Sequence, residues 1–174
     1  MERFGFIHDK LDIKILILFV LRRLPDYVQG DTLAELVLCD DCISYFDYTE
    51  CLDELIGTGH IERDGQRYRI TEKGDEHGGT IESSLPYSVR KKAEKLIEPV
   101  AQKLLRNKMI KTSHTAASGG VTVELSMSDG VGEVISMRLL AADEDHAAEM
   151  EKNFREHAEE YYGGIVELLS GHKE

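Results

Sequence analysis

One segment, from Cys42 to Thr71, constrains the fold of this chain more than any other. Its first part carries apolar residues at helical spacing, which predicts a helix with one apolar face made of Phe46, Leu52, Leu55 and Ile56. Ser44 is a suitable N-cap for this helix, and two glycines follow its last turn. The second part alternates apolar and polar residues on both sides of Asp64-Gly65, a pair typical of tight hairpin turns. The segment therefore predicts a helix that leads directly into a short β-hairpin.

Two further helices are predicted before this segment. The first, over residues 11–24, is apolar on more than one side, so we expect both sides to be buried, one of them by a second domain or a partner chain. A short second helix over residues 30–38 has Asp31 or Thr32 as its N-cap. The turn between the second and third helices is predicted at residues 39–42, which read Cys-Asp-Asp-Cys.

This order of helices followed by a hairpin predicts an N-terminal winged helix-turn-helix over residues 1–84. In that architecture the third helix is the recognition helix, whose outward side enters the major groove of DNA. The hairpin is the wing, and arginines in a wing commonly lie beside phosphates or in the minor groove. Leu85-Pro86 marks the expected domain boundary, because the residue before proline avoids the helical conformation while proline suits a first helical turn.

The C-terminal domain, residues 85–174, is predicted to combine a long helix, a sheet and a terminal helix. The long helix covers residues 87–109, with a kink or break expected at Pro99. Three strands follow at residues 109–117, 121–127 and 131–140, and their short connections predict a three-stranded antiparallel meander. Asp143 caps the terminal helix, which Gly163-Gly164 is expected to interrupt.

The sheet and the terminal helix each carry one apolar face and should pack on one another. We expect the buried residues to include Val123, Leu125, Ile135, Met137, Met150 and Phe154. The predicted fold class of the whole chain is therefore α+β.

Two segments resemble known families. The segment Tyr68-Arg-Ile-Thr-Glu-Lys-Gly74 resembles the passage from wing to helix in bacterial winged-helix regulators of the PadR and MarR types, and this resemblance covers residues 10–82. The chain as a whole is similar to an uncharacterised bacterial family of domains of unknown function, number 4364. The resemblance rests on the segment Leu85-Pro-Tyr-Ser-Val-Arg90 before the long helix, the meander and the terminal helix. It implies a cytoplasmic, regulator-like protein and no established ligand.

The predicted DNA-binding site has six residues, three on the recognition helix and three on the wing: Tyr45, Tyr48, Thr49, Arg63, Arg67 and Arg69. Four carboxylates on the outward side of the same helix oppose this prediction, namely Asp47, Glu50, Asp53 and Glu54. Carboxylates can accept a hydrogen bond from cytosine, but they repel the phosphates that supply most non-specific affinity. The net charge of −12 also provides no long-range attraction to nucleic acid. We therefore expect the wing to contribute more to DNA binding than the recognition helix.

Two less specific interpretations remain open. The wing arginines can instead pair with nearby carboxylates on a solvated hairpin. A second basic segment, from Arg90 to Lys111, carries a net charge of +6 in an acidic chain. It faces flanking DNA, pairs with an acidic surface such as the recognition helix of a partner, or forms a solvated helix face.

Catalysis is not predicted, because the chain has no glycine-rich phosphate loop, nucleophile elbow or His-Glu zinc helix. The three cysteines, Cys39, Cys42 and Cys51, are too few for a structural zinc site, so we predict no metal and no cofactor. Their odd number and close spacing favour a reducing cytoplasm over a secreted disulfide framework. The longest apolar run, Ile15 to Leu21, is too short to span a membrane.

The sequence thus predicts a cytoplasmic, homodimeric transcriptional regulator that binds double-stranded DNA. The alternative is a protein-interaction module with the same fold that no longer binds DNA. Neither interpretation identifies a small-molecule effector or an operator.

Overall fold

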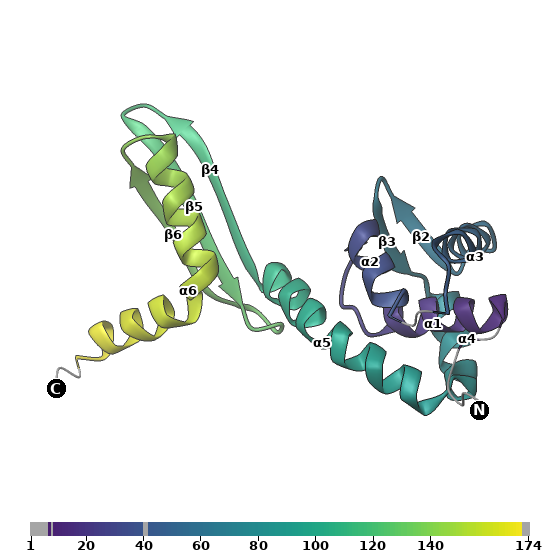
Figure 1. Cartoon of the computed structure of the whole chain (residues 1–174). Coiled ribbons are helices and arrows are strands. Elements are labelled where there is room, and N and C mark those ends of the chain that lie inside the picture. Colours follow the sequence, from purple (N-terminus) through teal and green to yellow (C-terminus); the bar gives the residue numbers. More distant parts are fainter. Residues whose placement is uncertain (1–6, 8, 40–41, 172–174) are drawn as a thin grey trace. The chain divides into compact units, whose positions relative to one another are not determined.

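The computed structural model describes residues 7, 9–39 and 42–171 (Figure 1). Asp40 and Asp41, which belong to the predicted turn, lie outside the described residues. The fold is mixed α+β and contains two antiparallel three-stranded sheets. The chain divides into two compact units, residues 1–105 and 106–174, which are considered separately.

The first unit consists of helices around a small sheet. Its elements, in chain order, are α1 (Lys10–Arg22), β1 (Val28–Gln29), α2 (Gly30–Val37), α3 (Tyr45–Gly57), β2 (Ile61–Asp64), β3 (Arg67–Ile70), α4 (Glu72–Ile81), the 3-10 turn η1 (Glu82–Ser84) and the beginning of α5 (Tyr87–Met109). The strand order is β1-β3-β2, so the sheet contains the predicted hairpin and one strand more. That strand, β1, pairs Val28 with Tyr68 and Gln29 with Arg67.

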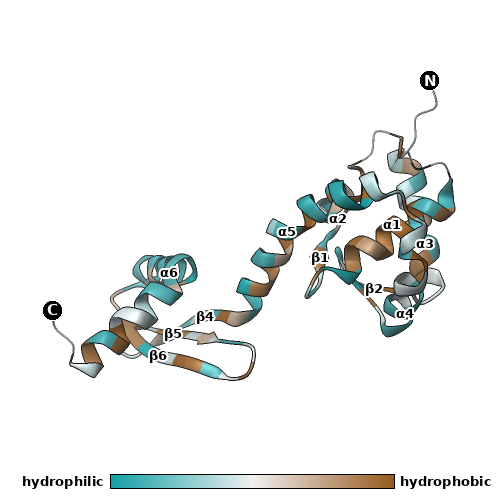
Figure 2. Ribbon diagram, turned by 90° about the horizontal axis from the view of Figure 1, so that it is seen from below, coloured by the Kyte–Doolittle hydropathy of each residue, from teal (hydrophilic) through white to brown (hydrophobic). Residues whose placement is uncertain are grey.

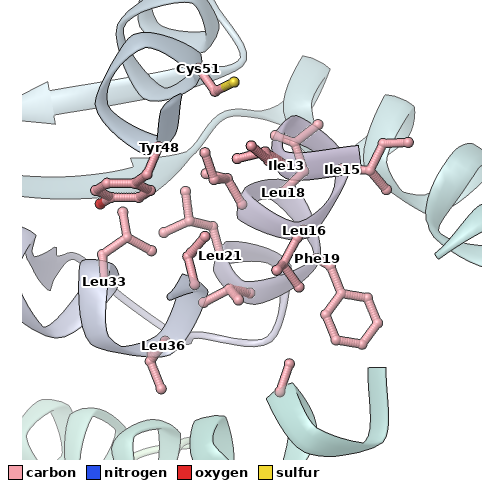
Figure 3. Packing of buried hydrophobic residues seen from close by; sticks show 14 of the residues in the cluster. Ile13, Ile15, Leu16, Leu18, Phe19, Leu21, Leu33, Leu36, Tyr48 and Cys51 are labelled. Atoms are coloured by element: carbon pink, nitrogen blue, oxygen red, sulfur yellow. The ribbon is translucent and has the colours of Figure 1, made fainter. Parts of the chain in front are cut away.

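Helix α1 forms the centre of the first unit. Its apolar residues from Ile13 to Leu21 are buried, and most of the helix is brown in the hydropathy colouring of Figure 2. Figure 3 shows Leu33 and Leu36 of α2 and Tyr48 of α3 among the side chains that surround it. The unit therefore covers α1 by itself, and the apolar character of this helix is not evidence for a partner chain, which corrects the argument made from the sequence.

Helix α3 begins as predicted, because the Ser44 hydroxyl accepts a hydrogen bond from the Asp47 amide at 3.1 Å. The buried face, however, is made of Tyr48, Cys51, Leu52 and Leu55. The prediction that Phe46 lies on this face is wrong, since its side chain is 73% exposed. The buried residues follow the i, i+3, i+4, i+7 spacing of one helical face, and residue 46 falls outside it.

Helix α4 packs closely against α1 and the loop that follows α3. Thr71 caps α4, as its hydroxyl accepts a hydrogen bond from the Gly74 amide at 3.1 Å. A Cβ atom at Gly78 would lie 2.8 Å from the Cδ atom of Arg22, so this glycine permits the close approach of the two helices. Arg22 also donates a hydrogen bond to Asp75 at 2.8 Å and one to Glu82 at 2.7 Å.

Of the kink or break predicted at Pro99, the break does not occur, because helix α5 continues through this residue. Its buried residues Val89, Ala93 and Ile97 belong to the core of the first unit. The division between the two units consequently falls after Leu105, later in the chain than the boundary at Leu85-Pro86 expected from the sequence.

The second unit is a meander covered on one face by a helix. Strands β4 (Ile110–Ala117), β5 (Gly120–Ser128) and β6 (Glu133–Ala141) pair in chain order, which confirms the predicted antiparallel meander. Helix α6 (Glu144–Ser170) lies along this sheet (Figure 1). The expected core is confirmed: Val123, Leu125 and Phe154 are buried, and partly buried Ile135, Met137 and Met150 pack against them.

Helix α6 changes direction at His157, whose backbone is not helical (φ −131°, ψ 27°). The helix continues through Gly163 and Gly164, where the sequence predicted an interruption. Beyond His157 it carries five exposed apolar or aromatic side chains, Tyr161, Tyr162, Val166, Leu168 and Leu169.

Candidate nucleic-acid interface

Helix α3, the start of α2 and the β2–β3 hairpin surround an open cavity of about 410 Å³. Four of the six predicted DNA-binding residues line this cavity: Tyr45, Tyr48, Thr49 and Arg63. Four further polar residues that were not among the predicted site residues line the cavity beside them: Gln29, Asp31, Gln66 and Tyr68. Asp31 and Gln29 could not be found from local patterns, because the pairing of the two-residue strand β1 with β3 brings them to the hairpin.

The other two predicted residues, Arg67 and Arg69, do not line the cavity but lie near Tyr27. Their guanidinium carbons lie 5.5 Å and 4.5 Å from the centroid of the Tyr27 ring. Arg69 also forms an ion pair with Glu62 at 2.5 Å, and Arg67 forms one with Asp64. The hydrogen bond with Glu62 raises the pKa of Arg69. Two of the three hairpin arginines are therefore already paired with carboxylates of the same hairpin.

Arg63 differs from these two arginines, because it donates its hydrogen bond to a backbone carbonyl. Its Nε donates to the oxygen of Gly65 at 2.8 Å. Its guanidinium carbon lies 5.7 Å from the centroid of the Tyr68 ring. Within the part of the chain that the structure describes, Arg63 has no carboxylate partner and so keeps a positive charge at the cavity.

Most carboxylates of α3 also have partners. Glu50 forms an ion pair with Lys10 at 2.6 Å, and Glu54 forms one with Lys14. The hydrogen bond with Lys14 lowers the pKa of Glu54. Asp47 accepts a hydrogen bond from the Ser44 hydroxyl at 2.6 Å. The repulsion that this helix exerts on a polyanion is therefore weaker than its sequence implies, because lysines of α1 offset two of its four carboxylates.

Asp53 is the exception on α3. It lines the cavity, and among the described residues it has no ion-pair or hydrogen-bond partner. Asp31 of α2 lines the same cavity and likewise has no ion-pair or hydrogen-bond partner in the described ranges. The two carboxylates at the cavity thus face a single cationic side chain, that of Arg63.

Tyr48 does not lie on the exposed side of α3, which corrects its predicted role as a surface contact. Its side chain is 2% exposed and forms part of the core. Its hydroxyl is buried and has no hydrogen-bond partner among the described residues. Burial raises the pKa of Tyr48, and the neighbouring Tyr68, Tyr45 and Asp31 act in the same direction.

Helix α2 begins at the cavity without a side-chain cap, although Asp31 or Thr32 was predicted to provide one. The N-cap is Gln29, and its side chain forms no capping hydrogen bond. Gly30 donates its amide hydrogen to the carbonyl oxygen of Gln66 at 2.9 Å. A Cβ atom at Gly30 would lie 3.0 Å from the ring of Tyr68, so the absence of a side chain allows α2 to approach the hairpin.

A model of the family described as Domain of unknown function (DUF4364) matches residues 13–169. The chain belongs to this family. No curated protein and no solved structure matches the chain. The matched range includes every element of both units except the ends of α1 and α6, so the cavity lies inside the part of the DUF4364 chain that defines the family.

The basic segment of the DUF4364 chain lies on α5, except for Lys111, which lies on β4. Lys91, Lys92 and Lys95 are exposed, and Lys91 forms an ion pair with Glu94 at 2.9 Å. The buried side of the same helix is apolar, so these lysines occupy its solvated face. Among the residues that the structure describes, no helix is both long and apolar enough to cross a membrane.

Proposed function

We propose that the first unit is a winged helix-turn-helix domain and that the DUF4364 protein is a transcriptional regulator that binds double-stranded DNA. The observation that carries this proposal is the element order α1-β1-α2-α3-β2-β3 together with the strand order β1-β3-β2. This arrangement puts α3 immediately before the hairpin. In a winged helix the corresponding helix enters the major groove, and the hairpin lies beside the backbone.

The charge distribution on α3 supports this function more than the sequence did. Lys10 and Lys14 hold Glu50 and Glu54, so part of the negative charge is compensated before DNA approaches. Thr49 and the exposed Tyr45 can contact phosphate or a thymine methyl group without adding charge. Arg63 adds a cation on the hairpin side.

A homodimer is part of the proposal. The evidence for it comes from the second unit and not from α1. Beyond His157, helix α6 exposes 75% of Leu168 and 83% of Leu169. A two-fold contact between two copies of this segment would remove both leucines from water. Symmetric regulators match operators with two-fold symmetry, so a dimer of this kind fits the proposed DNA binding.

Two observations favour the alternative of a protein-interaction module. Arg67 and Arg69 are paired within the hairpin, which leaves less cationic surface for phosphates. Tyr45 and Phe46 are 65% and 73% exposed at the start of α3, and aromatic residues are enriched in protein–protein interfaces.

The two functions are distinguished by titrating a fluorescently labelled duplex with the full chain at several salt concentrations. For a DNA-binding protein, replacing Arg67 and Arg69 together by Ala lowers affinity and reduces the salt slope by up to about two units. Arg138→Ala is the matched control, because this exposed arginine also pairs with a carboxylate, that of Glu124, but lies on the sheet of the second unit. Absence of binding by the unchanged protein at low salt would favour the interaction module.

A second double substitution, on α3, tests the role of the carboxylates of this helix. Replacing Glu50 by Gln and Asp53 by Asn removes repulsion at constant shape, so non-specific affinity should rise. The opposite result would be that these changes abolish sequence-specific binding while the arginine variant binds DNA with unchanged affinity. In that case α3 reads bases through its carboxylates, and the expectation that the hairpin contributes more to binding than α3 is wrong.

A further inference from the structure

We propose that the cavity between α2, α3 and the β2–β3 hairpin binds a small organic cation that carries an ammonium or guanidinium group. The site requires the chemistry of its lining only, and it does not depend on whether the protein binds DNA. Its volume of about 410 Å³ falls within the range of small-molecule sites.

Two tyrosines supply aromatic surface to the cavity. Tyr45 of α3 lines it and is 65% exposed, and its ring centroid lies 5.9 Å from that of the buried Tyr48. Tyr68 of β3 lines the cavity as well and is half-buried. The face of a tyrosine ring attracts a cation within about 6 Å of its centroid, and several rings together form the aromatic cages that hold ammonium ligands.

Two carboxylates give the cavity its negative charge. Asp31 and Asp53 line it, and neither has an ion-pair partner within the described ranges. The neighbouring acids of α3 differ from them, because Glu50 and Glu54 are bridged by lysines. With Arg63 as the cationic side chain of the lining, the formal charge of the cavity is −2 + 1, or −1. A cationic ligand would compensate this charge.

The Tyr48 hydroxyl is the second indication of a ligand. Tyr48 lines the cavity, is 2% exposed and has a hydroxyl without a hydrogen-bond partner in the part of the chain that is described. Buried polar groups are nearly always hydrogen-bonded, and an unpaired one is unfavourable. An ammonium or guanidinium N–H donated to the phenol oxygen would provide the missing bond.

An anion fits the same cavity less well. The uncapped start of α2 and the Arg63 guanidinium would attract a phosphate, but Asp31 and Asp53 would repel it from both helices. Arg63 itself supports the cation, because its guanidinium already lies 5.7 Å from the Tyr68 ring centroid. A bound cation would compete with Arg63 for this ring, so the effect of Arg63 on affinity has opposite signs for the two ligand classes.

The test titrates the full chain with butylammonium, which carries N–H donors, and, separately, with inorganic phosphate, and follows backbone amide NMR signals. Saturable shifts at Gly30 and Tyr68 are expected with butylammonium only. Asp53→Asn should weaken this binding about fivefold and Arg63→Ala should strengthen it, as expected for one cation–π or ion-pair contact. Asp47→Asn is the matched control, since Asp47 lies on the same helix but does not line the cavity.

Tyr48→Phe should also weaken binding, while the chain stays folded because the ring is retained. Saturable phosphate binding that Arg63→Ala abolishes would overturn the proposal, as would the absence of saturable butylammonium binding by the unchanged chain. A lysine side chain offers the same chemical group, so N-acetyl-lysine methylamide is titrated in parallel. Tighter binding of the lysine compound would overturn the assignment to a small molecule and favour a protein partner.

Discussion

Replacing Tyr48 by Phe should make the first unit more stable. The ring is packed in the core and is kept by this change, whereas the removed hydroxyl is buried without a hydrogen-bond partner among the described residues. An unsatisfied buried polar group is unfavourable by about 1–3 kcal/mol. The free energy of unfolding should therefore rise by about 1–3 kcal/mol, in contrast to the loss that most core substitutions cause.

The measurement is urea unfolding followed by circular dichroism, with hydrogen exchange to assign the change to residues 1–105. With a slope of about 2 kcal/mol per molar urea, a gain of about 2 kcal/mol moves the midpoint by about 1 M. Tyr45→Phe is the control, because the Tyr45 side chain is 65% exposed and its hydroxyl can bond water. That variant should stay within about 0.5 kcal/mol of the unchanged protein.

A loss of stability in Tyr48→Phe would refute this reasoning, because it would mean that the hydroxyl has a favourable partner. A gain would instead mean that the chain retains a hydroxyl that opposes folding. A destabilising group is expected to be retained where function requires it, and in the proposed cation site the Tyr48 hydroxyl has such a function, because it binds the ligand.

Three further predictions concern other parts of the molecule. In the same urea assay, Gly74→Ala should destabilise the first unit by about 1–3 kcal/mol, because the new Cβ would overlap the carbonyl oxygen of His60. Gly163→Ala should instead stabilise the chain by up to about 1 kcal/mol, because its Cβ would meet no atom and alanine has the higher helix propensity. Burial lowers the pKa of His60, and the charges of Lys73 and His77 lower it further, so the imidazole of the unfolded chain binds a proton more readily than that of the folded chain. Stability should be constant above about pH 6.5 and fall below it, and His60→Gln should remove this dependence. Sedimentation should show a dimer at micromolar concentration and a monomer for Leu168→Glu, and a dimer that survives this change would exclude the end of α6 as the contact.

Alternation and turn chemistry were sufficient to predict the second unit's sheet. Every second residue of β5 from Val121 to Met127 is buried, and the turns on either side contain glycines with positive φ, Gly119 and Gly130. The hairpin of the first unit was predicted for the same reason, since Gly65 adopts φ +61° between β2 and β3. These signals are local, so a single sequence contains them.

The incorrect predictions arise where local patterns are ambiguous. Aromatic residues occur on both sides of α3, so periodicity alone did not show that Tyr48 is inward and Phe46 outward. Strand β1 has two residues, too few for a periodic signal. Pro99 does not break α5, because it is exposed and the carbonyl of Lys95 that loses its amide partner can bond water.

The electrostatics of the candidate interface depended on contacts far apart in the sequence. The carboxylates of α3 are visible in the sequence, but their compensation by Lys10 and Lys14 requires α1 to pack beside α3. The cavity likewise forms only when β1 brings Asp31 to the hairpin. A pairing of residues 40 positions apart, such as Lys10 with Glu50, leaves no signal in a single sequence.

Selection of bound sequences from a pool of random duplexes tests the proposed function most directly. The unchanged full chain is incubated with the pool at low salt, and recovered duplexes are amplified and sequenced over several rounds. A DNA-binding homodimer should enrich a motif with two-fold symmetry whose half-sites are about one helical turn apart. Recovery of sequences no different from the starting pool, with no duplex retained at low salt, would contradict the account and leave the interaction module as the function of this fold.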